Sequence, residues 1–175
     1  MAWQLDGAHT SASFAVRHMM ISTVRGGFDK ASESAEVENG ELKSAKVDIE
    51  MGSVATRDAQ RDAHLKSQDF FDVEHHPLLQ FATTSVESAG GTSYRVAGDL
   101  TIRGVTKPVT LQAEITPPVR DPWGNERIGV SATGQIDRTD FGLTWNAALE
   151  AGGVLVGEQV KIEVDAEFVH VQDQG

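Results

Sequence analysis

One stretch decides the fold of this chain: Tyr94-Arg95-Val96-Ala97-Gly98-Asp99-Leu100-Thr101-Ile102-Arg103. Apolar or small residues stand at 94, 96, 98, 100 and 102, and Arg95, Asp99 and Arg103 stand between them. Successive side chains of a β-strand point to opposite faces, so this period of two predicts a strand with one buried face.

The same alternation recurs along the whole chain. The apolar faces it predicts are formed by Phe14, Val16 and His18; Ala45, Val47, Ile49 and Met51; Leu79, Phe81 and Thr83; Val109, Leu111, Ala113 and Ile115; Ile128, Val130, Ala132, Gly134 and Ile136; and Val160, Ile162, Val164, Ala166 and Phe168. Turn-forming sequences separate these runs, namely Asn39-Gly40, Ala89-Gly90-Gly91, Pro117-Pro118 and Asp121-Pro122-Trp123-Gly124-Asn125. We therefore expect about eight long antiparallel strands.

One helix is predicted at residues 57–66, with Thr56 as its N-cap and with Ala59 and Ala63 one turn apart. No repeat or linker divides the chain, so residues 1–175 are expected to form a single domain. Strands this long would expose unpaired edges unless the sheet closed on itself. The prediction is an all-β fold: one eight-stranded antiparallel β-barrel with one or two short helices, in preference to a sandwich.

Composition narrows the function. Twenty-six acidic and fifteen basic residues give a net charge of -11, which disfavours nucleic acid and anionic membranes as partners. No cysteine is present, so disulfides and thiolate chemistry are excluded. The sequence as given shows neither a signal peptide nor a membrane span, which predicts a cytoplasmic protein without stable membrane insertion. A trimmed mature form would instead be periplasmic or secreted.

The inward faces carry almost no charge and mix large residues with small ones such as Gly98 and Ala132. The small residues are expected to leave volume that the large ones do not fill. An eight-stranded barrel either fills its interior with side chains or holds one small ligand. Strands of about eleven residues, rising roughly 3.3 Å each and tilted near 40°, would enclose a tunnel on the order of 25–30 Å long. Such a tunnel suits a chain-like lipid, but the pattern alone leaves a solid core as an open alternative.

Several motifs resemble those of the bacterial YceI-like family, in the same order and over nearly the whole chain. They are the run from Asp6 to His18 (DGAHTSASFAVRH), Gly27-Phe28, Arg57-Asp58, Asp69-Phe70-Phe71-Asp72-Val73-Glu74, the run from Gly98 to Val109 (GDLTIRGVTKPV), the run from Asp137 to Trp145 (DRTDFGLTW) and Gly157-Glu158-Gln159-Val160. Two departures are the missing secretion signal and Ala31-Ser32-Glu33, where the family often has a second aromatic residue and a glycine.

The resemblance implies a lipocalin-like barrel that binds a polyisoprenoid or a similar long amphiphile, such as a quinone-like or fatty-acid-derived lipid, as a carrier or store. The residues expected to line the lumen are Phe14, Val16, His18, Phe28, Val47, Ile49, Met51, Phe71, Phe81, Tyr94, Val96, Leu100, Leu111, Val130, Trp145, Ile162 and Phe168. Candidates for contact with a polar head group are His9, His18 and Arg138. For Arg138, bracing of a loop is the alternative role.

No catalytic or metal-binding pattern stands out. Adjacent His75 and His76 would point to opposite faces of a strand, and no recognised ligand spacing is present. Nucleophile-elbow and nucleotide-binding motifs are also missing. We expect no cofactor, no metal and no enzymatic activity. The alternatives are an enzyme that modifies such a lipid, with His9 or His18 as acid–base, and a stress-related protein with a filled core. The sequence leaves open whether the protein forms a homodimer.

Overall fold

The computed structural model describes residues 2–6, 10–38, 41–147, 149 and 154–170. The strands of these residues all belong to one antiparallel sheet. The strands are β1 Ala2–Leu5, β2 Ser11–His18, β3 Ser22–Phe28, β4 Ala31–Glu38, β5 Glu41–Glu50, β6 Val54–Ala55, β7 Leu78–Gly90, β8 Ser93–Ile102, β9 Val105–Ile115, β10 Val119–Arg120, β11 Glu126–Asp137 and β12 Val156–His170.

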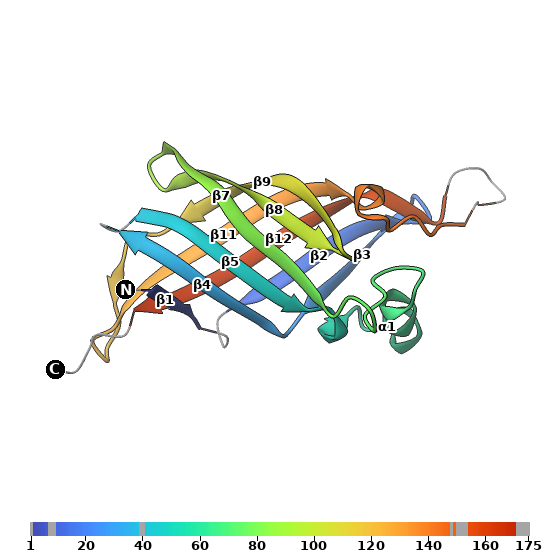
Figure 1. The fold of residues 1–175 in the computed structure, drawn as a ribbon, viewed down its shortest axis with the longest axis horizontal. Coiled ribbons are helices and arrows are strands. Elements are labelled where there is room, and N and C mark those ends of the chain that lie inside the picture. Colours follow the sequence, from blue (N-terminus) through green and yellow to red (C-terminus); the bar gives the residue numbers. More distant parts are fainter. Residues whose placement is uncertain (1, 7–9, 39–40, 148, 150–153, 171–175) are drawn as a thin grey trace.

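The sheet closes into a barrel. Hydrogen bonding passes from β11 through β9, β8, β7, β5, β4 and β1 to β12, and β12 pairs again with β11 along its length. Eight strands of the described chain therefore form a closed ring, as the sequence predicted. Because β12 is 15 residues long, it pairs with β1 near its end and with β2 nearer its start. Figure 1 shows the resulting elongated barrel with strongly tilted strands.

The predicted register is confirmed in β8, where Val96, Leu100 and Ile102 are buried and Arg95 and Asp99 are exposed. The turn that precedes β8 contains the glycines expected of a tight turn. Gly90 and Gly91 have φ values of 106° and 57°, which glycine adopts without a steric penalty. A second predicted turn, Asn39-Gly40, lies outside the described residues, although β4 and β5 pair from Glu38↔Glu41 onward.

The helix α1 spans Ala59–Lys66, and its N-cap is Asp58 rather than Thr56. The prediction of Thr56 was wrong because the Asp58 carboxylate accepts hydrogen bonds from the backbone N–H groups of Gln60 and Arg61, at 3.0 and 3.1 Å. Thr56 is buried and its hydroxyl donates to Asp62 at 2.6 Å. Two 3-10 turns, Met51–Ser53 and Arg138–Phe141, complete the helical structure of the described residues.

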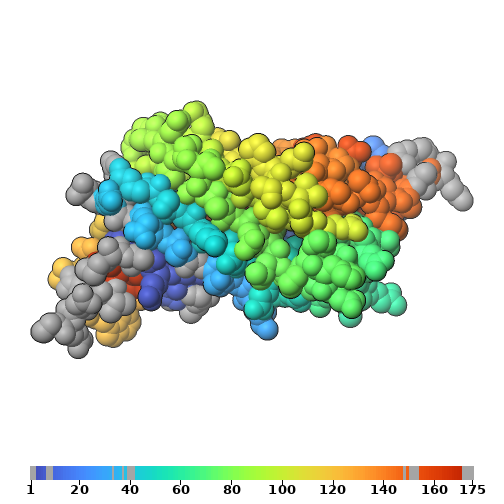
Figure 2. Space-filling view, in the orientation of Figure 1, coloured from blue at the N-terminus to red at the C-terminus, as the bar shows by residue number. Residues whose placement is uncertain are grey.

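The two ends of the barrel differ. The end that holds β1 and the last residues of β12 is closed by Trp3, Leu42, Ile128 and Phe168, each at most 5% exposed. Arg127 adds two ion pairs there, with its guanidinium 2.7 Å from Asp6 and 2.8 Å from Asp121. The helix α1 lies at the opposite end (Figure 1), and Figure 2 shows its segment packed over the lower part of that end.

No helix of the described residues has the length and apolar character needed to cross a membrane.

Candidate functional site

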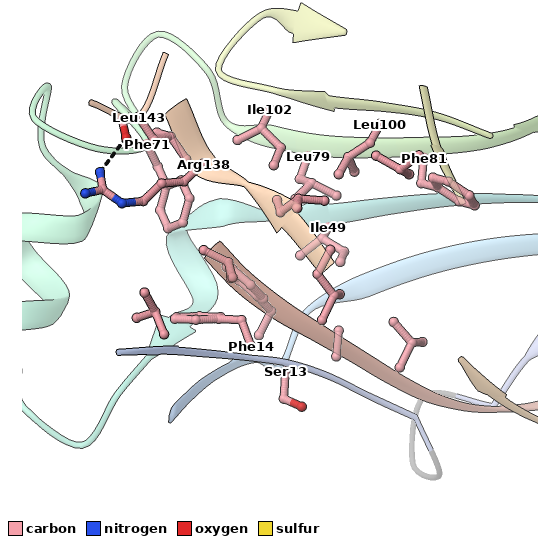
Figure 3. Close-up of a pocket in the computed structure, with 18 of the residues that line it drawn as sticks. Ser13, Phe14, Ile49, Phe71, Leu79, Phe81, Leu100, Ile102, Arg138 and Leu143 are labelled. Carbon is pink, nitrogen blue, oxygen red and sulfur yellow. Dashed lines mark hydrogen bonds between the residues drawn. The ribbon is translucent and has the colours of Figure 1, made fainter. Parts of the chain in front are cut away.

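A cavity of about 630 Å³ occupies the barrel interior. That volume is typical of small-molecule sites, which run from roughly 300 to 1,000 Å³, and exceeds the few small voids expected of a packed core. Figure 3 shows side chains of β5, β7 and β8 converging on it, among them Ile49, Phe81 and Leu100. The filled-core alternative therefore does not describe this barrel.

Small inward residues leave this space open only in part. Gly98 does not contribute, because a Cβ built on it would lie 2.5 Å from the Phe81 ring. Gly134 is covered in the same way by Leu111. The expectation that inward glycines leave free volume was thus wrong, since large neighbours interlock with them. The open space lies beside alanines, which line the cavity on five strands: Ala12, Ala45, Ala113, Ala132 and Ala166.

The structure places most of the predicted lumen residues in the cavity wall. These are Phe14, Val16, His18, Phe28, Val47, Ile49, Phe71, Phe81, Val96, Leu100, Leu111, Val130, Trp145, Ile162 and Phe168. Their contact with a ligand stays a prediction.

Met51 and Tyr94 are not in the wall of this cavity, contrary to the prediction. Met51 follows the end of β5 and is buried in a separate cluster with Ala12 and Ile49, because the 3-10 turn breaks the alternation. Tyr94 lies near the start of β8 and lines a small depression with Gln112 and Glu114. The cavity therefore ends at Val96, one inward position short of Tyr94.

The cavity opens at the end that carries α1. Of its lining residues, Arg17, Asp58 and Gln60 are exposed to solvent, and all three lie at the end of β2 or the start of α1. At the other end the lining residues, such as Phe168 and Ala113, are buried. We call this opening, formed by Arg17, His18, Asp58, Gln60, Arg61, His64, Leu155 and Val156, the mouth.

Most of the polar lining is concentrated at the mouth. Gln60, Arg61 and His64 come from α1, where spacings of three and four residues place side chains on one face. Arg61 is fixed by Thr56, whose hydroxyl accepts from Nε at 2.8 Å and whose carbonyl accepts from Nη2 at 2.6 Å. His64 hydrogen-bonds Asp69 at 2.8 Å and packs edge-on against Trp145, with ring centroids 4.5 Å apart.

The sequence interpretation missed Gln60 and Arg61 as site residues. Their signal was the i, i+4 spacing of Gln60 with His64 and of Arg61 with Leu65, on a helix that connects two barrel strands.

The three head-group candidates have different surroundings. His9 lies outside the described residues. His18 is half-buried in the cavity wall at the mouth, and among the described residues its ring nitrogens make no hydrogen bond within the protein. It is therefore free to hydrogen-bond a ligand.

Arg138 is committed to the protein itself. It is 4% exposed, and its guanidinium donates to the carbonyl oxygens of Gly157 (2.8 Å), Trp145 (3.0 Å), Val156 (3.2 Å) and Leu143. Figure 3 shows the bond to Leu143. Burial lowers the pKa of Arg138, although a guanidinium stays charged in proteins. The geometry favours the bracing role, in which Arg138 holds backbone carbonyl groups.

Two histidines outside the cavity, His75 and His170, have local partners, and His170 stacks on Trp3 with ring centroids 5.2 Å apart. His75 hydrogen-bonds Asp72 at 2.9 Å, and this bond raises the pKa of His75 above its ordinary value. Within the described part of the chain no group of three or more histidine, aspartate or glutamate side chains is arranged to hold a metal ion. The chemistry that the cavity offers is apolar contact along its length and hydrogen bonding at its mouth.

Comparison with proteins of known sequence shows where this barrel belongs. A model of the YceI-like domain matches residues 3–168 of the chain. A UPF0312 protein of Staphylococcus aureus (strain N315) is 39% identical over 166 residues, which cover 93% of this chain and 94% of the relative.

Solved structures agree with this assignment. The YceI protein of Campylobacter jejuni is 30% identical, with a TM-score of 0.78 over 89% of this chain and 90% of that one. At lower identity the likeness concerns the fold. BcnA of Burkholderia cenocepacia has a TM-score of 0.81 at 22% identity, over 93% and 98% of the two chains. A polyisoprenoid-binding domain of Saccharophagus degradans has a TM-score of 0.70 at 15% identity, over 95% and 97%. With its motifs, its barrel and the family model all in agreement, the chain belongs to the YceI-like family.

Proposed function

We propose that this protein binds one long apolar or amphiphilic lipid in the barrel lumen and acts as a carrier or store for it. The observation that carries the proposal is the cavity of about 630 Å³, whose wall is apolar along the barrel and polar at one end. A polyisoprenoid, quinone-like or fatty-acid-derived molecule has the matching chemistry, with a long tail and a compact head. The polyisoprenoid-binding domain of Saccharophagus degradans, which shares the fold, supports the same ligand class.

Binding, in preference to catalysis, is the function that the site supports. The polar groups at the mouth are Arg17, His18, Asp58, Gln60, Arg61 and His64. The structure pairs Arg61 with Thr56, His64 with Asp69, and the Asp58 carboxylate with backbone N–H groups of α1. A nucleophile activated by an adjacent base would need a hydrogen bond between two such groups and a third group to orient the base. No hydrogen bond joins any two of these six side chains. The arrangement suits recognition of a head group.

A chain-length series tests the proposal. Delipidated protein should bind prenyl alcohols with affinity that rises at each added isoprene unit, by about tenfold or more, because each buried CH₂ contributes about 0.8 kcal/mol. The gain should stop once the tail fills the closed lumen. Competition against a fluorescent prenyl probe measures this dependence. Affinities that do not change with chain length would contradict binding in the lumen.

His18 provides a second prediction. Replacing His18 with leucine should leave folding intact and weaken binding of a prenyl alcohol by roughly two- to tenfold, the value of one hydrogen bond. Binding of a prenyl hydrocarbon without a head group should not weaken. The exposed variant His75→Leu is the matched control, because His75 lies outside the cavity wall. Equal binding of the alcohol by wild type and His18→Leu would remove His18 from the head-group site.

A further inference from the structure

The turn between β2 and β3 carries three exposed apolar side chains. Met19, Met20 and Ile21 are 42%, 60% and 77% exposed. Val154, 39% exposed, lies nearby in the chain segment before β12, where the backbone N–H of Met19 donates to the Leu155 carbonyl at 2.7 Å. Single exposed apolar residues are ordinary on protein surfaces, whereas a contiguous group marks a contact surface. We call Met19, Met20 and Ile21 the apolar tip.

The backbone of the apolar tip is held in an unfavourable conformation. Met19 and Met20 have φ values of 53° and 61°, a region that bulky side chains rarely occupy. Hairpin turns with two residues of positive φ usually have asparagine or glycine at those positions, as the turn between β7 and β8 has with Gly90 and Gly91. A polar or glycine-containing turn would fit this backbone better. The two methionines therefore point to a role for the side chains themselves.

The apolar tip adjoins the mouth of the cavity. Arg17 and His18 directly precede it and line the cavity, as do Leu155 and Val156 on the neighbouring strand. The pair Val156↔His18 joins the two strands at this point. A lipid that enters or leaves the lumen through the mouth passes beside the apolar tip.

The positively charged guanidinium of Arg17 lies beside the apolar tip. Arg17 is exposed, and its guanidinium donates to the Met20 carbonyl and the Thr23 hydroxyl, both at 3.2 Å. The carboxylates of α1 and its flanks are engaged locally, Asp58 by backbone N–H groups of the helix and Asp62 by Thr56. An apolar end with an arginine behind it matches the depth profile of a bilayer, in which phosphates lie above the acyl chains. Two copies that each carry a net charge of -11 repel one another, whereas a zwitterionic phospholipid surface has no net charge to oppose the approach, and this favours a phospholipid surface over a second copy.

We propose that the apolar tip inserts into the surface of a phospholipid bilayer and holds the mouth against it while a lipid passes between membrane and lumen. This inference rests on the proposed function, since it concerns loading of that same cavity. Lipids with long apolar tails are almost insoluble in water, so the cavity must take its lipid from a membrane. The contact is peripheral and transient, in keeping with a tip of only three residues.

The test compares two matched variants in a transfer assay. The tip variant Met20→Asn/Ile21→Ser removes the two most exposed side chains of the apolar tip and places asparagine where φ is positive, so the turn is kept. The control variant Val119→Ser/Trp123→Ser removes side chains that are 63% and 79% exposed at the other end of the barrel. Phosphatidylcholine vesicles containing a fluorescent prenyl probe donate the lipid, and stopped-flow fluorescence follows its arrival in the protein.

We expect transfer to the tip variant to be at least tenfold slower than to wild type, and transfer to the control variant to be unchanged. Equilibrium binding of the probe from detergent and the melting temperature should be the same for all three proteins. Equal transfer rates would overturn the inference. So would a tip variant that alters only the monomer–dimer ratio in sedimentation, because the apolar tip would then contact a second copy. If wild type fails to bind the probe even from detergent, the proposed function itself fails, and this inference with it.

Discussion

Replacement of Ala132 with phenylalanine is expected to lower affinity for a long prenyl lipid by about 50-fold while leaving the lipid-free protein nearly as stable as wild type. Ala132 lies on β11 between Ala113 of β9 and Val164 of β12, and all three line the cavity. A ring at this position extends into space that a lipid tail would fill. Displacing three CH₂ groups from contact costs roughly 2–3 kcal/mol of binding free energy.

The control for Ala132→Phe is Gly98→Ala on the adjoining wall. A Cβ at Gly98 meets the Phe81 ring at 2.5 Å and the Ala82 carbonyl oxygen at 2.6 Å, so the wall itself must shift. We expect this smaller substitution to destabilise the protein by about 1–3 kcal/mol, with little change in probe affinity. Urea unfolding of delipidated protein and probe titration measure the two effects. If Ala132→Phe instead lost several kcal/mol of stability and retained full binding, the cavity would not be the ligand site.

Replacement of Arg138 with leucine should destabilise the protein by about 3–5 kcal/mol, the largest stability effect that we predict. Its guanidinium holds carbonyl groups of two chain segments together, Leu143 and Trp145 on one side and Val156 and Gly157 on the other. Leucine removes the donor that the four carbonyls share, and only the bond from the Asn146 amide to the Val156 carbonyl, at 2.7 Å, is kept among the side-chain bonds of the described residues. Arg138→Lys should be intermediate, because an ammonium group is a point donor and cannot span the planar fork of a guanidinium.

Arg95→Leu is the matched control for Arg138. Arg95 is more than half exposed and lies 3.6 Å from Glu87, a surface pair worth no more than about 1 kcal/mol. Chemical denaturation of the four proteins gives the comparison. Similar midpoints for Arg138→Leu and Arg95→Leu would show that the segment from Leu143 to Gly157 does not depend on Arg138. The head-group role would then be open again.

The barrel could be predicted because the alternation of apolar and polar residues in each strand indicates which face is buried. Leu100 and Ile102 line the cavity and Arg95 faces solvent, as the period of two requires. Closure followed from strand length, since the sheet has no other means of pairing its long edges. The YceI-like motifs then indicated the ligand class, which periodicity alone could not give.

The predictions were wrong where the alternation of apolar and polar residues in a strand ends, or where residues far apart in the sequence determine the packing. Met51 follows the last residue of β5, and the 3-10 turn there sets its direction. Gly98 was expected to leave a gap, but the space above it depends on the rotamer of Phe81 across the sheet. The local preferences of the residues predict neither the direction of Met51 nor the space above Gly98.

The mouth could not be assembled from the sequence. The position of α1 depends on the bonds from Thr56 to Arg61 and Asp62 and on the packing of His64 against Trp145, which is 81 residues further along the chain. The bracing role of Arg138 also depends on backbone carbonyls up to 19 residues away, and a carbonyl has no sequence signature. Both features depend on the three-dimensional structure and cannot be predicted from the local sequence.

Native mass spectrometry of delipidated protein with a long-chain prenyl alcohol can show whether one lipid chain occupies the lumen. We expect a single added lipid per chain for wild type, retained at collision energies that strip surface-bound lipid, and its loss in Ala132→Phe. Organic extraction of the isolated complex should return the same alcohol. If wild type retained no lipid, or if Ala132→Phe retained it as firmly as wild type, the lumen would not be the lipid-binding site.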